Sequence, residues 1–415
     1  MEIFVHYQSL SIGSWKSLRV GRFTFRQHFR LQLKRCKRLV EWVVYAAFDA
    51  VALRLPPPVS GHSAVFVCAQ LLGDYELCKP YIRACFDQWR RENLKTVLVC
   101  NAAWKELVAD DLHPDQTIDV DVYKLTHDLR YRVEMLRGLR RLQACIAICA
   151  AHPRDGIVHD ACMKSVAASK SFCYQDEYSD RAAIDGRMAR RHYTNVVRCP
   201  SDIHRSERHA LLIAAAGISP PSGPVPLPRG KLHLENPKTP YLVISPGASR
   251  PEKTWPLSRF VAIANRAMVE YPNLSCVLVG SPAEAVWIDA MCAELGERTT
   301  SLAGRNSLSE LQACIRDSVA VLGNDSAAIH IAAACRVPSV VAMNGATYGH
   351  CLPYPHRDNP VFPIAPTMAV EIMSCFRCDW NCRFSIVDGA PFPCLDALKV
   401  DQVWDKLSPI LAQRQ

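Results

Sequence analysis

The 415-residue sequence contains no uninterrupted apolar run of about 20 residues, which is the length that a membrane-spanning helix needs. Its most apolar N-terminal stretch, Leu39–Leu53, has 15 residues and is interrupted by Glu41 and Asp49. We therefore expect that this segment does not cross a bilayer. No small-residue cleavage site follows an apolar segment near the N-terminus, so we also expect no cleavable signal peptide.

Net charge is small over most of the chain. The net charge is +9, and residues 1–55 hold ten basic residues against Glu2, Glu41 and Asp49, which gives +7 and leaves +2 for the rest. This distribution argues against a nucleic-acid partner and predicts that residues 1–55 meet an anionic surface. The dinucleotide fingerprint Gly-x-Gly-x-x-Gly does not follow the first predicted strand.

Cysteine, in contrast, is abundant. The 19 cysteines are an odd number and lie scattered among apolar residues, which predicts mostly free, packed thiols in a reducing cytoplasmic compartment. Four near the C-terminus follow the spacing Cys-x2-Cys-x3-Cys-x11-Cys, which departs from the paired spacing of zinc knuckles. We therefore expect no metal and keep these four only as weak candidate ligands: Cys375, Cys378, Cys382 and Cys394.

Residues 26–55 carry apolar side chains at three- and four-residue steps, which predicts a basic helix ended by Pro56-Pro57-Pro58. Two interpretations are open. The helix could lie in a membrane interface, with Trp42, Tyr45 and Phe48 at the boundary. Alternatively, it could pack on the surface of its own protein.

Short apolar runs alternate with helical stretches from Ser63 onward, for example a strand over 64–69, a helix over 79–92 and a strand over 96–100. This alternation is typical of a parallel sheet covered on both faces. It restarts after a proline-rich stretch, which predicts two doubly wound, Rossmann-like α/β domains that face a cleft. The predicted divisions are a basic helical extension (1–60), a first domain (61–220), a linker (221–239) and a second domain with a cysteine-rich tail (240–415).

The first candidate site follows the first strand, at Gly73-Asp74. A glycine there lets the backbone approach a ligand, and an Asp just past a strand end can face the cleft. Asp74 could act as a general base that accepts a proton from an attacking hydroxyl. It could equally cap the following helix, and the spacing alone favours the cap.

Two segments of the second domain are candidate phosphate sites. The loop over 245–256 joins a strand to a helix through small residues, with Ser249 and Lys253 placed to hold a pyrophosphate. Asp325 and Ser326 precede a helix whose N-terminal amides also favour phosphate, although His330 in that helix could be an ordinary packed histidine. Glu284, after another strand, could bond a ribose diol or merely favour a helix dipole.

Taken in order, these motifs resemble glycosyltransferase family 9, the ADP-heptose:lipopolysaccharide heptosyltransferases. The likeness rests on LLGDYELCKP, SPGASRPEKTWPLSRF, LVGSPAE and GNDSAAIHIAAACRVPSVVAMNGAT, and it does not cover residues 1–60. The resemblance implies a GT-B type fold. It also implies Asp74 as catalytic base, Lys253 and Ser249 on the diphosphate, and Glu284 on the ribose. Asp325, Ser326 and His330 would line the donor pocket.

The implied activity is inverting, metal-independent transfer of a sugar, with heptose from ADP-heptose favoured as donor and no cofactor. The acceptor would be a lipid-linked glycan such as lipopolysaccharide core. The protein would act in the cytoplasm, with residues 1–55 on the anionic inner-membrane surface. Two rivals are open: a sugar-nucleotide epimerase or hydrolase on the same plan, and an inactive membrane-associated scaffold.

Overall fold

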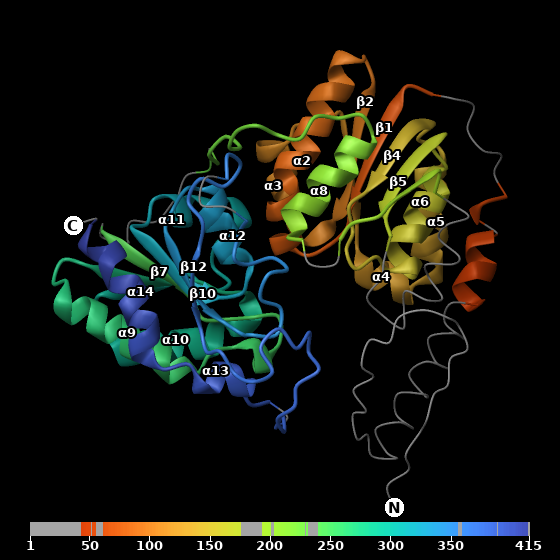
Figure 1. Cartoon of the computed structure of the whole chain (residues 1–415). Coiled ribbons are helices and arrows are strands. Elements are labelled where there is room, and N and C mark those ends of the chain that lie inside the picture. The colour runs from red at the N-terminus through yellow and green to blue at the C-terminus, as the bar shows by residue number, and fades with distance from the viewer. Residues whose placement is uncertain are drawn as a thin grey trace, which may run out of the picture.

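The computed structural model describes residues 43–50, 52–54, 61–175, 193–200, 203–228, 230, 240–355, 359–387 and 389–413. Within these residues the chain forms two α/β domains, each built on one six-stranded sheet (Figure 1). Every strand pair in both sheets is parallel. The predicted pair of doubly wound domains is therefore confirmed.

The first domain holds its sheet in the order β3-β2-β1-β4-β5-β6. Alternate residues of β1 enter two different cores, because Ala64 and Phe66 point to one face while Val65 and Val67 point to the other. Apolar residues on both faces are what a doubly covered parallel strand requires. The strands are β1 (Ser63–Cys68), β2 (Lys95–Asn101), β3 (Gln116–Val120), β4 (Ala144–Cys149), β5 (Lys170–Tyr174) and β6 (Asn195–Val197).

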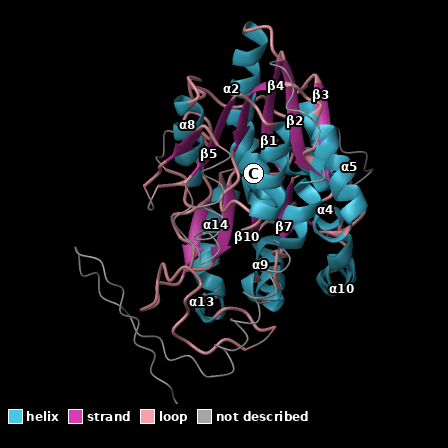
Figure 2. Ribbon diagram, turned by 90° about the vertical axis from the view of Figure 1, so that its right-hand side faces the viewer, coloured by secondary structure: helices cyan, strands magenta, loops and turns pink. Residues whose placement is uncertain are grey.

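Helices cover both faces of this sheet. The face that carries Phe66 packs against α2 (Leu72–Arg91), α3 (Glu106–Asp111) and α8 (Arg205–Ala215), and the opposite face packs against α4 (Val122–His127), α5 (Leu129–Arg140) and α6 (Ala161–Val166). Figure 2 shows the helices on either side of the strands.

The sequence predicted that the helix after β1 begins at Lys79, and this was wrong. Helix α2 begins at Leu72, and Pro80 lies inside it. Gly73 and Pro80 both weigh against a helix locally. The first turns nevertheless bury Tyr75, Leu77 and Cys78, so tertiary packing overrides the local propensity.

The second domain repeats the plan, with strand order β12-β11-β10-β7-β8-β9. Its strands are β7 (Tyr241–Ser245), β8 (Ser275–Leu278), β9 (Thr299–Ser301), β10 (Ala320–Asn324), β11 (Ser339–Met343) and β12 (Thr367–Val370). Its helices are α9 (Leu257–Glu270), α10 (Ala285–Leu295), α11 (Leu308–Arg316), α12 (Ala327–Ala334), α13 (Pro393–Ala397) and α14 (Val400–Ala412). In chain order, both sheets follow the 3-2-1-4-5-6 arrangement of the Rossmann fold.

The described end of the predicted basic helix is docked on the first domain. Residues 43–50 are helical, and Asp49 forms an ion pair with the buried Arg132, whose Nε lies 2.6 Å from Asp49 Oδ1. Tyr45 bonds to the carbonyl of Thr126 and lies under the Arg132 guanidinium. For this part of the helix the packed interpretation holds. Residues 1–42 lie outside the described residues.

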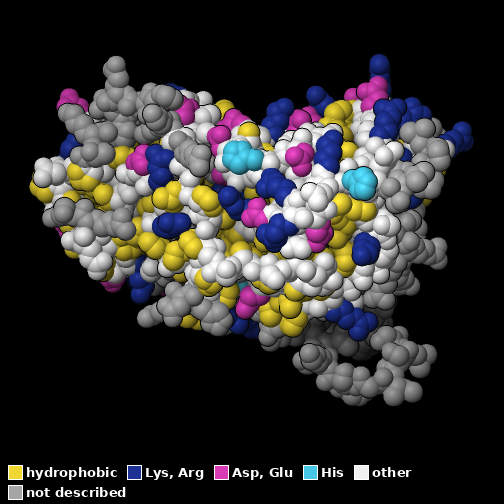
Figure 3. Space-filling view, turned by 90° about the horizontal axis from the view of Figure 1, so that it is seen from above, with side chains coloured by type: hydrophobic (Ala, Val, Ile, Leu, Met, Phe, Trp, Pro, Cys, Tyr) yellow, Lys and Arg dark blue, Asp and Glu magenta, His cyan; other side chains and the backbone are white. Residues whose placement is uncertain are grey.

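None of the described helices combines the length and apolar character that a bilayer crossing demands. In the view from above, Lys and Arg side chains are interspersed with Asp and Glu on the visible face, and they do not form a basic stripe (Figure 3).

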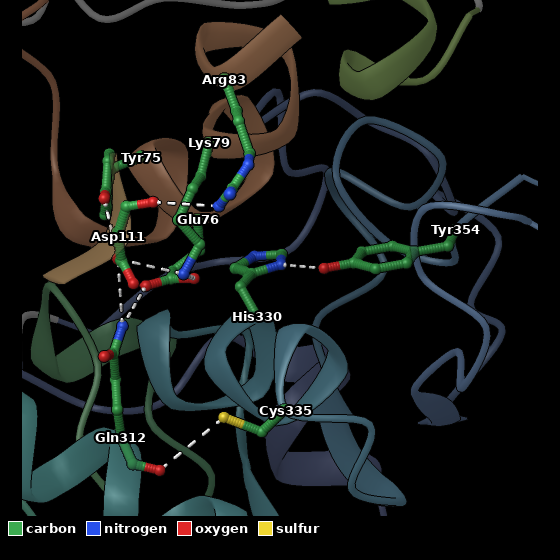
Figure 4. A network of polar contacts seen from close by, with 9 residues as sticks. All are labelled: Tyr75, Glu76, Lys79, Arg83, Asp111, Gln312, His330, Cys335 and Tyr354. Atoms are coloured by element: carbon green, nitrogen blue, oxygen red, sulfur yellow. Dashed lines mark hydrogen bonds and ion pairs between the residues drawn. The ribbon is translucent and has the colours of Figure 1, made fainter. Parts of the chain in front are cut away.

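The two domains meet where α12 packs against α2 and α11 packs against α3. A buried polar network crosses this contact (Figure 4). Lys79 Nζ lies 2.8 Å from Glu76 Oε2 and 3.2 Å from Asp111 Oδ2, and Gln312 of the second domain donates to Glu76 at 3.1 Å. Burial raises the pKa of Glu76, which the nearby Lys79 ammonium opposes. The network fixes how the cleft-forming loops of the two domains face each other.

Candidate active site at the domain interface

The candidate residues leave the carboxyl ends of the central strands of each sheet. In the first domain, Asp74 follows β1, which neighbours β4. In the second domain, the loop over 246–256 follows β7, and Asp325 follows the neighbouring β10. In a 3-2-1-4-5-6 sheet the strand order reverses between these two strands, and the crevice beyond that point is where ligands bind.

Asp74 lies in the first turn of α2, and it does not cap this helix. The N-cap position is Leu71, without a side-chain cap bond. The Asp74 carboxylate forms an ion pair with Arg205, the first residue of α8, 131 residues further along the chain. The capping interpretation is therefore wrong. The carboxylate is instead held at the domain interface by a cation that sequence reasoning did not find.

Gly73, the residue before Asp74, sits directly against the start of α12 in the other domain. A Cβ atom placed on Gly73 would lie 3.2 Å from His330 Cδ2 and 3.6 Å from Ala327 Cα, so glycine is what permits the approach. Burial raises the pKa of Asp325, which Lys253 and Arg205 oppose and Asp74 reinforces. The charged groups of both domains thus share one small region.

Lys253 ends a short 3-10 turn, Pro251–Lys253, and is half-buried. Burial and the nearby Arg250 lower the pKa of Lys253, while Asp325 and Asp74 oppose that shift. The Lys253 ammonium lies 4.4 Å from the centre of the Trp380 ring, within cation–π distance. Ser249 is exposed on the same loop. A half-buried cation beside two carboxylates is well placed to meet a diphosphate.

Asn324 holds this loop, and sequence reasoning did not single it out. Its side chain is fully buried, accepts from Trp255 N at 2.9 Å and donates to the carbonyls of Pro246 at 2.7 Å and Gly247 at 3.3 Å. Both ends of the loop around Lys253 are therefore tied to the end of β10. The sequence signal that could have identified Asn324 is an amide side chain at the end of a buried strand.

We expect Asn324→Ala to destabilise the protein by about 2–4 kcal/mol, because one buried amide N–H and two carbonyls lose their partner. The free energy of unfolding from urea titration checks this. Asn306→Ala, which removes a partly exposed Asn side chain outside the loop, is the control and should cost less than about 0.5 kcal/mol. Equal stability of Asn324→Ala and the wild type would contradict the assigned role.

Glu284 makes a capping box with Ser281, accepting from Ser281 N at 2.7 Å and from Ser281 Oγ at 2.8 Å through Oε2. Its other oxygen faces Gly247, where an added Cβ would lie only 1.8 Å from Oε1. The helix-start interpretation is thus realised in the structure. A role of Glu284 on a ribose stays a prediction.

Ser326 is the N-cap residue of α12, yet it makes no side-chain cap bond. Among the described residues, its buried Oγ atom has no hydrogen-bond partner. A buried hydroxyl without a partner costs stability unless a ligand or water satisfies it. It stands at the start of α12, where unpaired amides and the helix dipole favour an anion.

His330 is packed: it is 4% exposed, its Nδ1 lies 2.8 Å from the Tyr354 hydroxyl, and its ring stacks on Tyr354 (Figure 4). Its Nε2 lies 3.9 Å from Asp325 Oδ1. Burial, with His204 and Arg205, lowers the pKa of His330 to about 3. The imidazole is therefore neutral at pH 7, and 3.9 Å is too long for a hydrogen bond to Asp325. A direct role of His330 on the donor stays a prediction.

Stability should fall when the pH drops below 6.5. Burial lowers the pKa of His152 and His330 to about 3 and of His159 and His204 to about 4. The unfolded chain, with histidine pKa values of about 6.5, then binds more protons than the folded one, and each site costs up to about 1.4 kcal/mol per pH unit. The free energy of unfolding from urea titration should be clearly lower at pH 5.0 than at pH 7.5, and this decrease should be smaller in His330→Gln than in the wild type. A flat profile would contradict these shifts.

The cysteine-rich segment packs directly on the Lys253 loop. Trp380 lies under Lys253 and Arg250, and Phe392 N donates to Glu252 O at 2.8 Å. Arg377, Asp379 and Trp380 all have positive φ, a backbone state that non-glycine residues adopt only when the surroundings enforce it. Sequence reasoning missed Trp380, which a lone aromatic between two cysteines does not reveal.

The four C-terminal cysteines line one small, mostly apolar cavity together with Met373, Phe376 and Trp380. All four are free thiols. Burial raises the pKa of Cys378 and Cys394, which disfavours the thiolate that a metal needs. Throughout the part of the chain that the structure describes, no group of three or more His, Cys, Asp or Glu side chains could hold a metal ion.

The chain contains one Asp-x-Asp, Asp119-Val120-Asp121, a pairing of carboxylates that suits a divalent cation. In the structure, both carboxylates have other partners. Asp121 caps α4 by accepting from Lys124 N at 2.9 Å, and Asp119 pairs with Lys105 at 3.1 Å. The pair thus helps to build the first domain and does not belong to the candidate site.

Two Rossmann-like domains, with charged groups gathered at the switch points of both sheets, form the GT-B type of fold. Residues 180–365, somewhat less than half of the chain, match the sequence profile described as glycosyltransferase family 9 (heptosyltransferase), and this match supports a glycosyltransferase. Among curated protein sequences, no significant match is found.

Solved structures share the fold at low sequence identity. E. coli ADP-heptose lps heptosyltransferase II matches with 16% identity and a TM-score of 0.59, over 85% of this chain and 99% of that one. A family 9 glycosyl transferase from Veillonella parvula matches with 15% identity and a TM-score of 0.60, over 86% and 100%. E. coli heptosyltransferase WaaC with ADP-2-deoxy-2-fluoro heptose matches with 15% identity and a TM-score of 0.56, over 83% and 99%.

Proposed function

We propose that the protein transfers a sugar, with inversion, from a nucleotide sugar to a hydroxyl of a lipid-linked glycan such as lipopolysaccharide core. The observation that carries this proposal is the contact between Gly73-Asp74 and the start of α12. This contact supports the proposal because Asp74 follows Gly73 directly, and because the start of α12 offers N-terminal amides that favour an anion and a hydroxyl, Ser326 Oγ, without a partner among the described residues. ADP-heptose is the favoured donor, because WaaC, which shares the fold, is described with a fluorinated ADP-heptose.

The reaction would proceed by one in-line displacement. Asp74 accepts the proton of the acceptor hydroxyl as that oxygen attacks the anomeric carbon. The bond between the anomeric carbon and the diphosphate oxygen breaks, and the nucleoside diphosphate leaves with the electron pair. Lys253, Ser249, Ser326 and the amides at the start of α12 stabilise the developing negative charge. Glu284 would hold the nucleoside ribose.

A thermal-shift panel tests the donor class. ADP-, UDP- and GDP-sugars are added to the full chain, and a donor present at 100 times its Kd should stabilise the fold by about 2.7 kcal/mol. We expect the ADP-sugar to raise Tm most. Stabilisation by none of the three would contradict the proposal.

Lys253 and the helix end take the place of a metal ion in this proposal. Transfer should therefore continue in EDTA at no less than about half of its rate, since no step would depend on a divalent cation. Product formation followed with and without chelator checks this. Loss of transfer that added Mg²⁺ or Mn²⁺ restores would contradict the metal-independent route.

We also propose that the basic segment over residues 1–55 holds the protein to the anionic cytoplasmic face of the inner membrane, near a lipid-linked acceptor. On the described helix, Val43, Val44 and Phe48 are exposed while Asp49 is buried against the first domain. Neutralising Lys34, Arg35, Lys37 and Arg38 to Gln leaves the Asp49–Arg132 pair intact. It should abolish salt-sensitive sedimentation with phosphatidylglycerol vesicles. Unchanged sedimentation would contradict the proposal.

A further inference from the structure

Arg205, the first residue of α8, pairs with the proposed base Asp74 on the neighbouring helix α2. The two side chains are 16% exposed for Arg205 and 21% exposed for Asp74, so solvent only partly screens the pair. Sequence reasoning assigned Arg205 no role. Its position at the interface matters chemically, because a guanidinium beside a carboxylate stabilises the charged form and so weakens it as a base.

The backbone of Arg205 is anchored on the donor domain. Arg205 N donates to His350 O at 2.9 Å, and the ring of the preceding His204 lies 2.6 Å from Cys351 O through its Nε2. His204 also packs edge-on against Tyr354, which stacks on His330. The start of α8 is thus fixed against the segment that borders α12, and only the long Arg205 side chain can change partners.

An ion-paired carboxylate is a weaker base than a free one, because the cation stabilises its charged form. Asp74 can accept a proton efficiently only when the pair with Arg205 loosens. The proposed diphosphate position, at the start of α12, lies beside Asp74, since Gly73 approaches Ala327 there. A guanidinium fork matches phosphate oxygens at least as well as a carboxylate.

We propose that Arg205 is a donor-binding residue that exchanges partners. It pairs with Asp74 in the free enzyme and with a diphosphate oxygen of the bound donor, so that donor binding releases the base for the acceptor hydroxyl. This inference rests on the proposed function. It implies that Asp74 and a nucleoside diphosphate compete for one guanidinium.

A double-mutant cycle measures that competition. The affinity for ADP is determined by isothermal titration calorimetry for the full-length wild type, Asp74→Asn, Arg205→Gln and the double variant. We expect Arg205→Gln to weaken ADP binding about tenfold, as loss of a charge-assisted bond does. Asp74→Asn should tighten ADP binding about fivefold in the wild type and by less than about twofold in the Arg205→Gln background.

Two further variants guard the interpretation. Arg205→Lys keeps the positive charge but loses the two-pronged guanidinium. Its ADP affinity should lie between those of the wild type and Arg205→Gln. This variant also provides a test if Arg205→Gln does not fold. Arg305→Gln removes an Arg that pairs with Asp289 on the donor-domain surface and should leave ADP binding unchanged. Equal tightening by Asp74→Asn with and without Arg205 would overturn the exchange while the proposed function stands. Failure of the wild type to bind ADP, UDP or GDP would overturn both.

Discussion

Asp74→Asn should lower kcat for sugar transfer by about 10³-fold, within the range of 10²–10⁴ that a positioned general base contributes. The amide keeps the size of the carboxylate but takes up no proton from the acceptor hydroxyl. The donor binds mainly to the other domain, and Asp74→Asn frees Arg205 for the diphosphate, so the donor KM should not rise. Initial rates at saturating acceptor, with donor concentration varied, separate the two parameters.

Asp119→Asn is the matched control for this variant. It removes a carboxylate of the same domain that pairs with exposed Lys105, and it also breaks the chain's one Asp-x-Asp. We expect it to retain at least about half of the wild-type kcat, because surface ion pairs contribute little. A loss on Asp119→Asn comparable with that on Asp74→Asn would move the active site away from Asp74.

Lys253→Ala should reduce kcat/KM for the donor by about 10²-fold or more, since it removes the cation that meets the departing diphosphate. Lys253→Arg keeps the charge and should recover a large part of the loss. The ammonium is half-buried over Trp380, so it is held in place before the donor arrives. Steady-state kinetics with the nucleotide sugar that stabilises the wild type most provides the measurement.

Lys105→Ala serves as control for Lys253→Ala, because it removes an exposed lysine that pairs only across the surface of the first domain. Its kcat/KM should stay within about twofold of the wild type. If Lys253→Ala were as active as the wild type, the proposal that the loop over 246–256 holds the diphosphate would be contradicted.

The sheets were predictable because their strands are continuous apolar runs, a pattern that parallel strands covered on both faces require. Tyr241–Ser245 and Val65–Cys68 carry this signal without ambiguity. The start of α2 was not predictable, because Gly73 and Pro80 are local breakers and only the burial of Tyr75 and Leu77 in the assembled core compensates. The packing that decides this boundary is formed by residues distant in the sequence.

The positions of the candidate residues Asp74, Lys253 and Asp325 after strand ends were predictable, while their roles stay predictions. The residues that support the candidate site were not predictable. Arg205 lies 131 residues from Asp74, and Asn324 bonds to Trp255 across 69 residues. Contacts between residues so distant in the sequence produce no periodic pattern from which a single sequence could predict them. Trp380 depends in addition on an irregular segment whose positive φ values no local pattern indicates.

The central claim is that the second domain grips a sugar diphosphate with Lys253 and the start of α12 and presents the sugar to Asp74. The most direct measurement is a crystal structure of Asp74→Asn with an ADP-sugar bound. We predict diphosphate oxygens within hydrogen-bond distance of Lys253 Nζ and Ser326 Oγ, with the anomeric carbon facing residue 74. A nucleotide bound elsewhere, or a sugar turned away from residue 74, would contradict it.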